Sequence, residues 1–137
     1  MELDLSPANT MEPANRMQQD VLIVEDDPII ALGFEDMILE FGVLAVRTAG
    51  CVARALELIA DRAPGFALLD VGLVREKSFA VAERLEALQI PFVFVTGYGA
   101  DVRLPQRFAA RPRLTKPCSS DALKAILTAL PAGGARR

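Results

Sequence analysis

Short apolar runs alternate with longer amphipathic stretches along most of the chain. Five runs rich in β-branched and aromatic residues predict buried strands at 21–24, 43–48, 66–70, 91–96 and 113–115. The stretches between them predict helices at 29–41, 51–62, 79–88 and from Ser119 to about Leu130. Strands that alternate with helices of this length form βαβ units. The pattern therefore predicts an α/β fold, a doubly wound parallel sheet of five strands with helices on both faces.

Local signals mark several ends of these elements. Asp27 is expected to cap the first helix, with Pro28 at its first position, and Gly42 to close it. Ser119 is expected to cap the last helix and is assigned no chemistry. The segment 97–111 contains Gly97, Gly99 and Pro105, which interrupt any regular helix, so a short or poorly ordered helix is predicted there.

The two ends of the sequence lack this pattern. Residues 1–19 hold two prolines and scattered polar residues, which predicts a disordered arm before a domain at 20–130. The arm is interpreted as a linker remnant, a docking segment or a segment without function. Residues 131–137 are Gly-rich and predict a flexible tail. Neither a signal peptide nor an apolar run of membrane-spanning length is present in the sequence, so a cytoplasmic location without membrane contact is expected.

The composition narrows the possible chemistry. The 137 residues include no histidine, which excludes Ser-His-Asp and Cys-His nucleophile pairs, histidine-bearing zinc sites and a phosphohistidine on this chain. A net charge of −3 gives no reason to expect nucleic acid as a partner. Cys51 and Cys118 form no CxxC pair, and neither a disulfide framework nor a zinc site is expected. Three arginines in or beside the second predicted helix are expected to form a solvated face: Arg47, Arg54 and Arg62.

Polar residues stand where four of the predicted strands end. Glu25 and Asp26 follow the first strand, Asp70 ends the third, Thr96 ends the fourth and Lys116 follows the fifth. Ligands bind outside the carboxyl ends of parallel strands, so these groups are expected to converge. Clustered carboxylates repel one another unless a cation joins them, and oxygen ligands suit Mg²⁺. A carboxylate beside a metal and a lysine is also a nucleophile towards phosphorus, so this edge of the sheet predicts phosphoryl transfer.

Four segments carry a family resemblance: VLIVEDDP, FALLD, PFVFVTGYG and LTKP. In this order and spacing they resemble the receiver domain of two-component response regulators. PFVFVTGYG is similar to the stand-alone subfamily named after a Phe-Ala-Thr-Gly-x-Tyr motif, with Val95 in place of the alanine. The resemblance implies a flavodoxin-like sheet with strand order 2-1-3-4-5. It also implies that Asp70 is the phosphorylated residue and that Mg²⁺ is bound by Glu25 (through a water), Asp26, Asp70 and the backbone carbonyl of Gly72.

The resemblance assigns the remaining roles with one departure. Thr96 is expected to bind a phosphoryl oxygen, and Lys116 to pair with Asp70 before transfer and with the phosphoryl group after it. The Lys116–Pro117 bond is expected to be cis. Arg113 stands where most receivers carry the aromatic switch residue, which leaves Tyr98 either as a replacement switch or as a half-buried loop anchor.

Together these features predict a stand-alone response regulator of a phosphorelay. Its partners would be a histidine kinase or a histidine phosphotransfer protein and a further downstream protein, and it would signal by protein contact or by shuttling or draining phosphoryl groups. No output domain is expected, because about seven residues follow the last predicted helix. The chain is not expected to be an enzyme beyond its own phosphorylation and autodephosphorylation. A phosphorylation-independent adaptor and a Mg²⁺-dependent phosphatase or phosphotransferase remain as alternatives.

Overall fold

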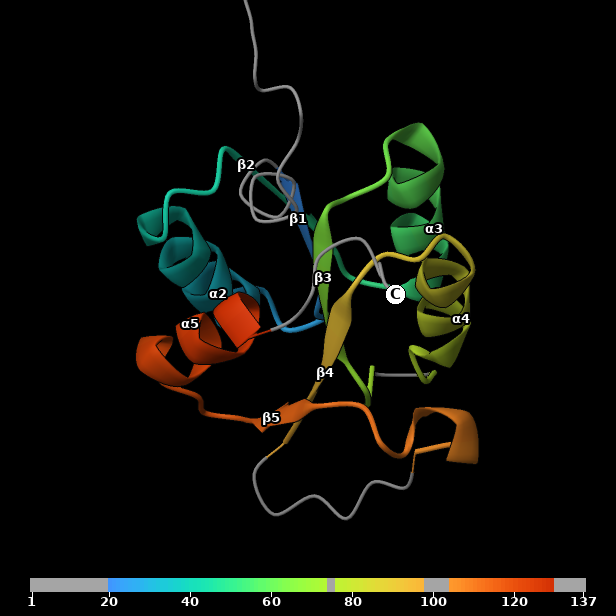
Figure 1. The fold of residues 1–137 in the computed structure, drawn as a ribbon. Coiled ribbons are helices and arrows are strands. Elements are labelled where there is room, and N and C mark those ends of the chain that lie inside the picture. Colours follow the sequence, from blue (N-terminus) through green and yellow to red (C-terminus); the bar gives the residue numbers. More distant parts are fainter. Residues whose placement is uncertain (1–19, 74–75, 98–103, 130–137) are drawn as a thin grey trace, which may run out of the picture.

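Five short strands pair in parallel in the order β2-β1-β3-β4-β5 (Figure 1). They are β1 (Asp20–Val24), β2 (Ala45–Ala49), β3 (Phe66–Asp70), β4 (Phe92–Thr96) and β5 (Arg113–Thr115). The structure is a computed structural model that describes residues 20–73, 76–97 and 104–129. The predicted fold class and strand order are confirmed, while the predicted arm and tail lie outside the described residues.

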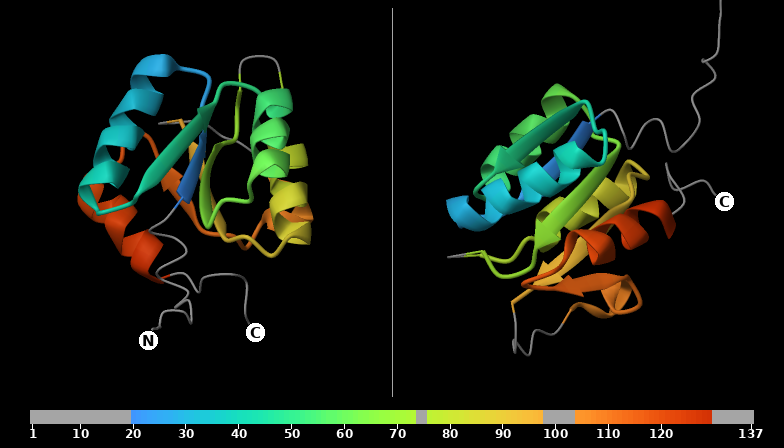
Figure 2. Two further views of the ribbon diagram at one scale, coloured as in Figure 1. Left: turned by 90° about the horizontal axis from the view of Figure 1, so that it is seen from above. Right: turned by 90° about the vertical axis from the view of Figure 1, so that its left-hand side faces the viewer.

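In the part of the chain that the structure describes, helices cover both faces of the sheet (Figures 1 and 2). The pairs are α2 (Pro28–Glu40) with α5 (Ser120–Ala129), and α3 (Val52–Asp61) with α4 (Phe79–Ala87). Side chains alternate along β1, so that Val21 and Ile23 pack in the core under α2 and α5, while Leu22 and Val24 pack in the core under α3 and α4. Burial on both faces explains why the central strands read as continuous apolar runs.

The predicted helix ends agree with the observed ones to within a residue or two. The Asp27 carboxylate accepts hydrogen bonds from the backbone N–H groups of Ile29 and Ile30 at 2.9 and 3.2 Å, which confirms it as the cap of α2. Gly42 follows this helix with a φ of 95°, a conformation that favours glycine. The hydroxyl oxygen of Ser119 accepts a hydrogen bond from the backbone N–H of Ala122 at 3.1 Å and so caps α5.

Strand β2 begins later than the sequence pattern predicted. The prediction placed a strand at 43–48, whereas β2 starts at Ala45, which pairs with Asp20 at the first position of β1. Residues before Ala45 have no partner in the ladder, and Leu44 is 78% exposed. An apolar run alone does not reveal where the neighbouring strand begins.

The segment between β4 and β5, in which glycines and a proline interrupt the helical pattern, contains a short 3-10 helix, η1 (Gln106–Phe108). Its anchor is Phe108, which is fully buried and packs against the rings of Phe79, Phe92 and Phe94 at centroid distances of 5.5 to 6.2 Å. The prediction of a short helix is therefore confirmed, and residues 98–103 lie outside the described part of the chain.

The predicted solvated arginine face is wrong at Arg47. Its side chain is only 14% exposed and binds both carboxylate oxygens of Asp20, at 2.8 and 3.1 Å. Arg62 adds a contact of 2.8 Å to the same carboxylate, although its side chain is 59% exposed. Arg54, with an exposed pair to Glu57, fits the prediction, and the side chain of Arg62 is equally exposed. Asp20, at the start of β1 and at the end of the sheet opposite Glu25, thus forms a partly buried charge cluster with Arg47 and Arg62, of which Arg47 was wrongly predicted to be solvated.

Candidate functional site

The carboxyl ends of the parallel strands bring the predicted site residues to one edge of the sheet. Glu25 and Asp26 directly follow β1, while Asp70 and Thr96 are the last residues of β3 and β4. Lys116 follows β5, and its backbone N–H donates to the carbonyl of Thr96 at 2.7 Å. These groups surround a cavity of about 340 Å³. Its full lining is Glu25, Asp26, Asp27, Ile30, Asp70, Gly72, Thr96, Gly97 and Lys116.

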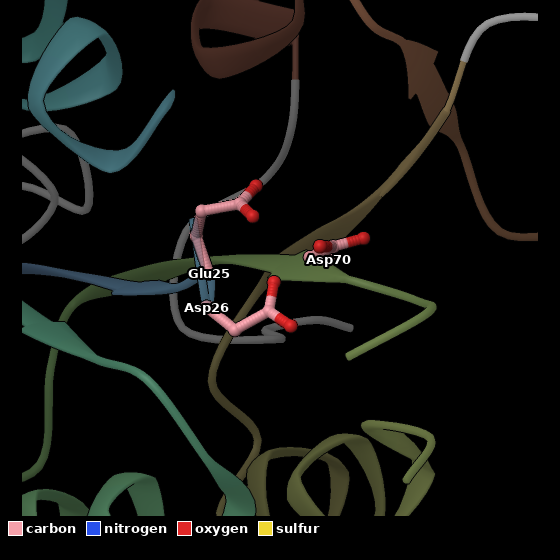
Figure 3. Close-up of side chains that lie close together, drawn as sticks. All are labelled: Glu25, Asp26 and Asp70. Atoms are coloured by element: carbon pink, nitrogen blue, oxygen red, sulfur yellow. The ribbon is translucent and has the colours of Figure 1, made fainter. Parts of the chain in front are cut away.

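Three carboxyl groups gather in this cavity (Figure 3). One carboxylate oxygen from each of Glu25, Asp26 and Asp70 lies within 4.8 Å of the others. Glu25 and Asp70 are buried, whereas Asp26 is half-buried. Such a set of hard oxygen ligands with an open side fits Mg²⁺, which keeps several of its waters.

Lys116 bridges two of the acids. Its ammonium group lies 2.7 Å from Oε1 of Glu25 and 3.2 Å from Oδ2 of Asp70, and its own side chain is 17% exposed. The Lys116–Pro117 peptide bond is cis, as expected. One cation therefore partly neutralises a site that carries three acids.

The buried acid and the lysine shift each other's titration. Burial raises the pKa of Glu25 to about 7, against the lowering effect of the Lys116 ammonium and of the backbone N–H of Asp27. Burial alone would lower the pKa of Lys116, but its hydrogen bonds and charge interactions with Glu25 and Asp70 raise it overall. Oε1 of Glu25, which lies 2.7 Å from the Lys116 ammonium, is a carboxylate oxygen with two lone pairs, so it can also accept from a further donor such as a metal-bound water.

Backbone and hydroxyl groups complete the site. The N–H of Gly72 donates to Oδ1 of Asp70 at 3.2 Å and so orients the carboxylate that also binds Lys116. The Thr96 hydroxyl is buried at the cavity wall, and its contact to the carbonyl of Leu114 is long, at 3.5 Å. A hydroxyl held this weakly within the protein can turn to another acceptor.

Not every predicted residue belongs to this cluster. Asp27 lines the cavity but is engaged as the cap of α2, in agreement with the prediction. Tyr98, the predicted switch candidate, lies outside the described residues. Arg113 is an exposed residue of β5. Sequence reasoning missed Ile30 in the cavity wall, although its place one turn into the helix after the acid pair was a usable signal.

An apolar groove adjoins the cavity. It has a volume of about 540 Å³ and is lined by Ile30, Gly33, Phe34, Met37, Gly97, Lys116, Pro117 and Cys118. Beside it, Ile29 and Leu32 of α2 are 80% and 56% exposed. The polar site therefore opens next to an apolar surface. Among the described helices, none combines the length and apolar character needed to cross a lipid bilayer.

Known proteins resemble this chain in sequence and fold. Residues 21–128 match the family described as response regulator receiver domain. The solution structure of SdrG from Sphingomonas melonis Fr1 is 43% identical, with a TM-score of 0.72, and the match covers 80% of this chain and 93% of that one. A solution structure of the BeF3-activated conformation of SdrG from Pseudomonas melonis Fr1 is 42% identical, with a TM-score of 0.69, covering 82% and 94% of the two chains.

A longer relative matches over a similar stretch. The phyllosphere-induced regulator PhyR of Methylorubrum extorquens is 29% identical over 113 residues, which are 80% of this chain but only 40% of PhyR. The chain thus spans less than half the length of that curated relative. The family match extends from β1 into α5 and includes every strand whose end lines the cavity. The chain therefore belongs to the receiver domain family of two-component response regulators, and its PFVFVTGYG segment is consistent with the Phe-Ala-Thr-Gly-x-Tyr subfamily.

Proposed function

We propose that Asp70 accepts a phosphoryl group from a phosphohistidine on a partner protein, in a reaction that requires Mg²⁺. The observation that carries the proposal is the contact of Lys116 with both Asp70 and Glu25, in a cavity where three carboxylates converge. A lysine that pairs with the acceptor before the reaction is placed to pair with phosphoryl oxygens after it.

The transfer exchanges one bond at phosphorus for another. A carboxylate oxygen of Asp70 attacks the phosphorus atom, the P–N bond of the phosphohistidine breaks, and the imidazole leaves with that electron pair. Lys116 then stabilises negative charge on the transferred group, and the hydroxyl of Thr96 donates to another of its oxygens. Because the product is an acyl phosphate, water can later hydrolyse it and regenerate Asp70.

The acidic cluster supports a role for a divalent cation. Asp26, Asp70 and the backbone carbonyl of Gly72 would hold Mg²⁺ directly and Glu25 would hold it through a water, so that the ion neutralises charge on the phosphoryl group. Without a cation, the three acids carry more negative charge than Lys116 balances, which disfavours approach of an anionic donor. We therefore expect chelation of Mg²⁺ to stop phosphorylation while the fold persists.

The donor is proposed to be a histidine kinase or a histidine phosphotransfer protein. None of the 137 residues is a histidine, so none of them can carry the phosphohistidine. The apolar groove and the exposed Ile29 and Leu32 beside the cavity support contact with a protein surface. The BeF3-activated state of a 42% identical relative supports phosphorylation as the activating event, because beryllofluoride imitates a phosphoryl group on a carboxylate.

The output is proposed to be contact with a downstream protein, or transfer of the phosphoryl group onwards within a relay, in the cytoplasm. The chain would act on no separate substrate and so would not be an enzyme in the ordinary sense. Tyr98 remains a hypothesis for the switch residue. A Tyr98→Ala variant is expected to change the lifetime of phospho-Asp70 or the response to beryllofluoride, and unchanged behaviour in both would remove the hypothesis.

Incubation with a ³²P-labelled phosphohistidine donor protein and Mg²⁺ tests the proposal. Wild type is expected to take up label stoichiometrically, and Asp70→Ala is expected to take up none. Absence of label in wild type would indicate a phosphorylation-independent adaptor. Many turnovers of a small phosphorylated substrate would indicate a phosphatase or phosphotransferase.

A further inference from the structure

Helix α3 is capped by a residue from a different part of the chain. Its own N-cap residue, Cys51, makes no side-chain hydrogen bond to the helix. Instead, Oε2 of Glu76 accepts a hydrogen bond from the backbone N–H of Val52, the first residue of α3, at 3.0 Å. A carboxylate at this end of a helix also interacts favourably with the helix dipole.

Glu76 belongs to the loop that leaves the site after Asp70. Among the described residues of this segment, Gly72 and Lys77 form an antiparallel bridge, and the N–H of Ser78 donates to the carbonyl of Val71 at 3.3 Å. Ser78 is fully buried, which fixes the returning end of the loop. The inner end of the loop therefore lies at Asp70, and Glu76 ties its outer part to α3.

Gly72 lies between these two attachments. Its N–H holds Oδ1 of Asp70, and the Lys77 ammonium lies 3.8 Å from the position that a Cβ on Gly72 would occupy. A displacement of Glu76 would shift Lys77, its chain neighbour, and through the bridge would shift Gly72. The backbone that orients the phosphoryl acceptor is thus mechanically connected to the first turn of α3.

We propose that Glu76 is a positioning residue for the phosphoryl-acceptor site, which it serves by connecting the bridged residues Gly72 and Lys77 to the N-terminus of α3. This inference rests on the proposed function of Asp70 for its kinetic consequence. The competing interpretation is that Glu76 only stabilises α3 as a cap. The two differ in what happens when α3 receives a cap of its own.

A substitution at Cys51 can distinguish the positioning role of Glu76 from a role as a helix cap alone. It is exposed and has extended backbone angles, φ −155° and ψ 168°, which are typical of an N-cap residue. Cys51→Ser therefore supplies a local cap for α3 without restoring the connection to the loop. Glu76→Gln keeps a side-chain oxygen that can accept the Val52 N–H, and Glu57→Ala removes an exposed acid from the same helix as a charge control.

The experiment measures three quantities in full-length protein: the phosphorylation rate with phosphoramidate and Mg²⁺, the urea midpoint, and hydrogen exchange of the Gly72 amide. Glu76→Ala is expected to lower the rate and to speed Gly72 exchange, each roughly three- to tenfold, the range for loss of one typical solvent-exposed hydrogen bond. In Cys51→Ser/Glu76→Ala the urea midpoint is expected to recover while rate and exchange stay altered. Glu76→Gln is expected to retain most of the rate, and Glu57→Ala all of it.

If the phosphorylation rate and the protection of the Gly72 amide both recover in the double variant, Glu76 acts only as a helix cap and the proposal is wrong. The proposal is also wrong if Glu76→Ala has the same phosphorylation rate and Gly72 exchange as wild type. If wild type takes up no phosphoryl group, the proposed function fails instead. Gly72 exchange would still decide the positioning role in that case, because it requires no phosphorylation.

Discussion

At the scale of single residues, the surroundings of the Asp20 carboxylate predict a large effect of substitution on stability. Two guanidinium groups bind it, and that of Arg47 is mostly buried and also donates to the carbonyl oxygens of Leu58 and Arg62. Removing one charge from a buried pair leaves the other charge desolvated without compensation. Breaking the pair is therefore expected to destabilise the protein. This loss does not measure the net contribution of the ion pair to the stability of the fold.

Asp20→Asn is expected to lower the free energy of unfolding by about 3 kcal/mol, the lower end of the range for breaking a buried pair, because Arg62 retains access to water. Urea unfolding measures this loss. The exposed pair Arg54–Glu57 is the control, and Arg54→Gln there is expected to cost less than about 0.5 kcal/mol. Equal losses in the two variants would show that the cluster at Asp20 is solvated, as the sequence first indicated.

Gly72 offers a contrasting prediction at the site itself. It has no positive φ, and a Cβ there would meet, within 4 Å, only the flexible end of Lys77 at an ordinary contact distance of 3.8 Å. Its two proposed contributions, the N–H that donates to Asp70 and the carbonyl that would bind Mg²⁺, both come from the backbone. Gly72→Ala is therefore expected to fold with a stability change within about 0.5 kcal/mol and to be phosphorylated at a rate close to that of wild type. A loss of phosphorylation in a folded Gly72→Ala protein would contradict the described loop conformation.

At the scale of elements, η1 is held against α4 by both packing and charge. Arg107 and Arg111 bind the carboxylate of Glu86 at 2.6 and 2.9 Å, and the Arg111 guanidinium lies 4.3 Å from the centre of the Phe92 ring. The hydrogen bond from Arg111, aided by Arg107, lowers the pKa of Glu86 below its ordinary value of 4.5. The contribution of these ion pairs to the stability of the protein should therefore depend on pH.

The sign of this dependence follows from the lowered pKa. Glu86 contributes its full stabilisation above about pH 4.5, and the contribution is lost as the pH falls through the lower pKa of the folded state. Because the group is 31% exposed, solvent screening limits the effect, and Glu86→Gln is expected to cost less than about 1 kcal/mol at pH 7. Urea midpoints of the two proteins should converge once the pH falls below the lowered pKa that Glu86 has in the folded state. A difference that stays constant from pH 7 to the acid range would assign the effect to packing.

Packing of the same element has a larger expected effect. Phe108 has no exposed surface and contacts three other phenylalanine rings. Phe108→Ala is expected to lower the free energy of unfolding by about 3–5 kcal/mol, as for other buried aromatic truncations. Denaturant unfolding checks the value. A loss below about 1 kcal/mol would mean that η1 is not anchored through this ring.

Elements also show what sequence reasoning could reach. Strand and helix identity followed from hydrophobic period, and the caps Asp27 and Ser119 followed from residues adjacent in sequence. The start of β2, the pairing of Arg47 with Asp20 and the capping of α3 by Glu76 depend on segments 24 to 27 residues apart. The pattern of neighbouring residues does not predict such contacts, because they form only after the strands have paired.

At the scale of the whole molecule, the parallel sheet separates two groups of charges. The acids and Lys116 lie beyond the carboxyl ends of the strands, while the Asp20–Arg47–Arg62 cluster lies at the opposite end of β1. The convergence at the carboxyl ends was predictable because parallel strands share one direction. The distances that connect Lys116 to Glu25 and Asp70 were not, since they depend on how the chain turns after β5.

The central claim is that Asp70 is a Mg²⁺-dependent phosphoryl acceptor. The most direct test incubates the protein with acetyl phosphate, with Mg²⁺ or with a chelator, traps any acyl phosphate by borohydride reduction, and locates the modified residue by peptide mass. One modification at Asp70, present only with Mg²⁺ and absent from Asp70→Asn, is the expected result. No modification, modification without the metal, or the same yield in Asp70→Asn would contradict the claim.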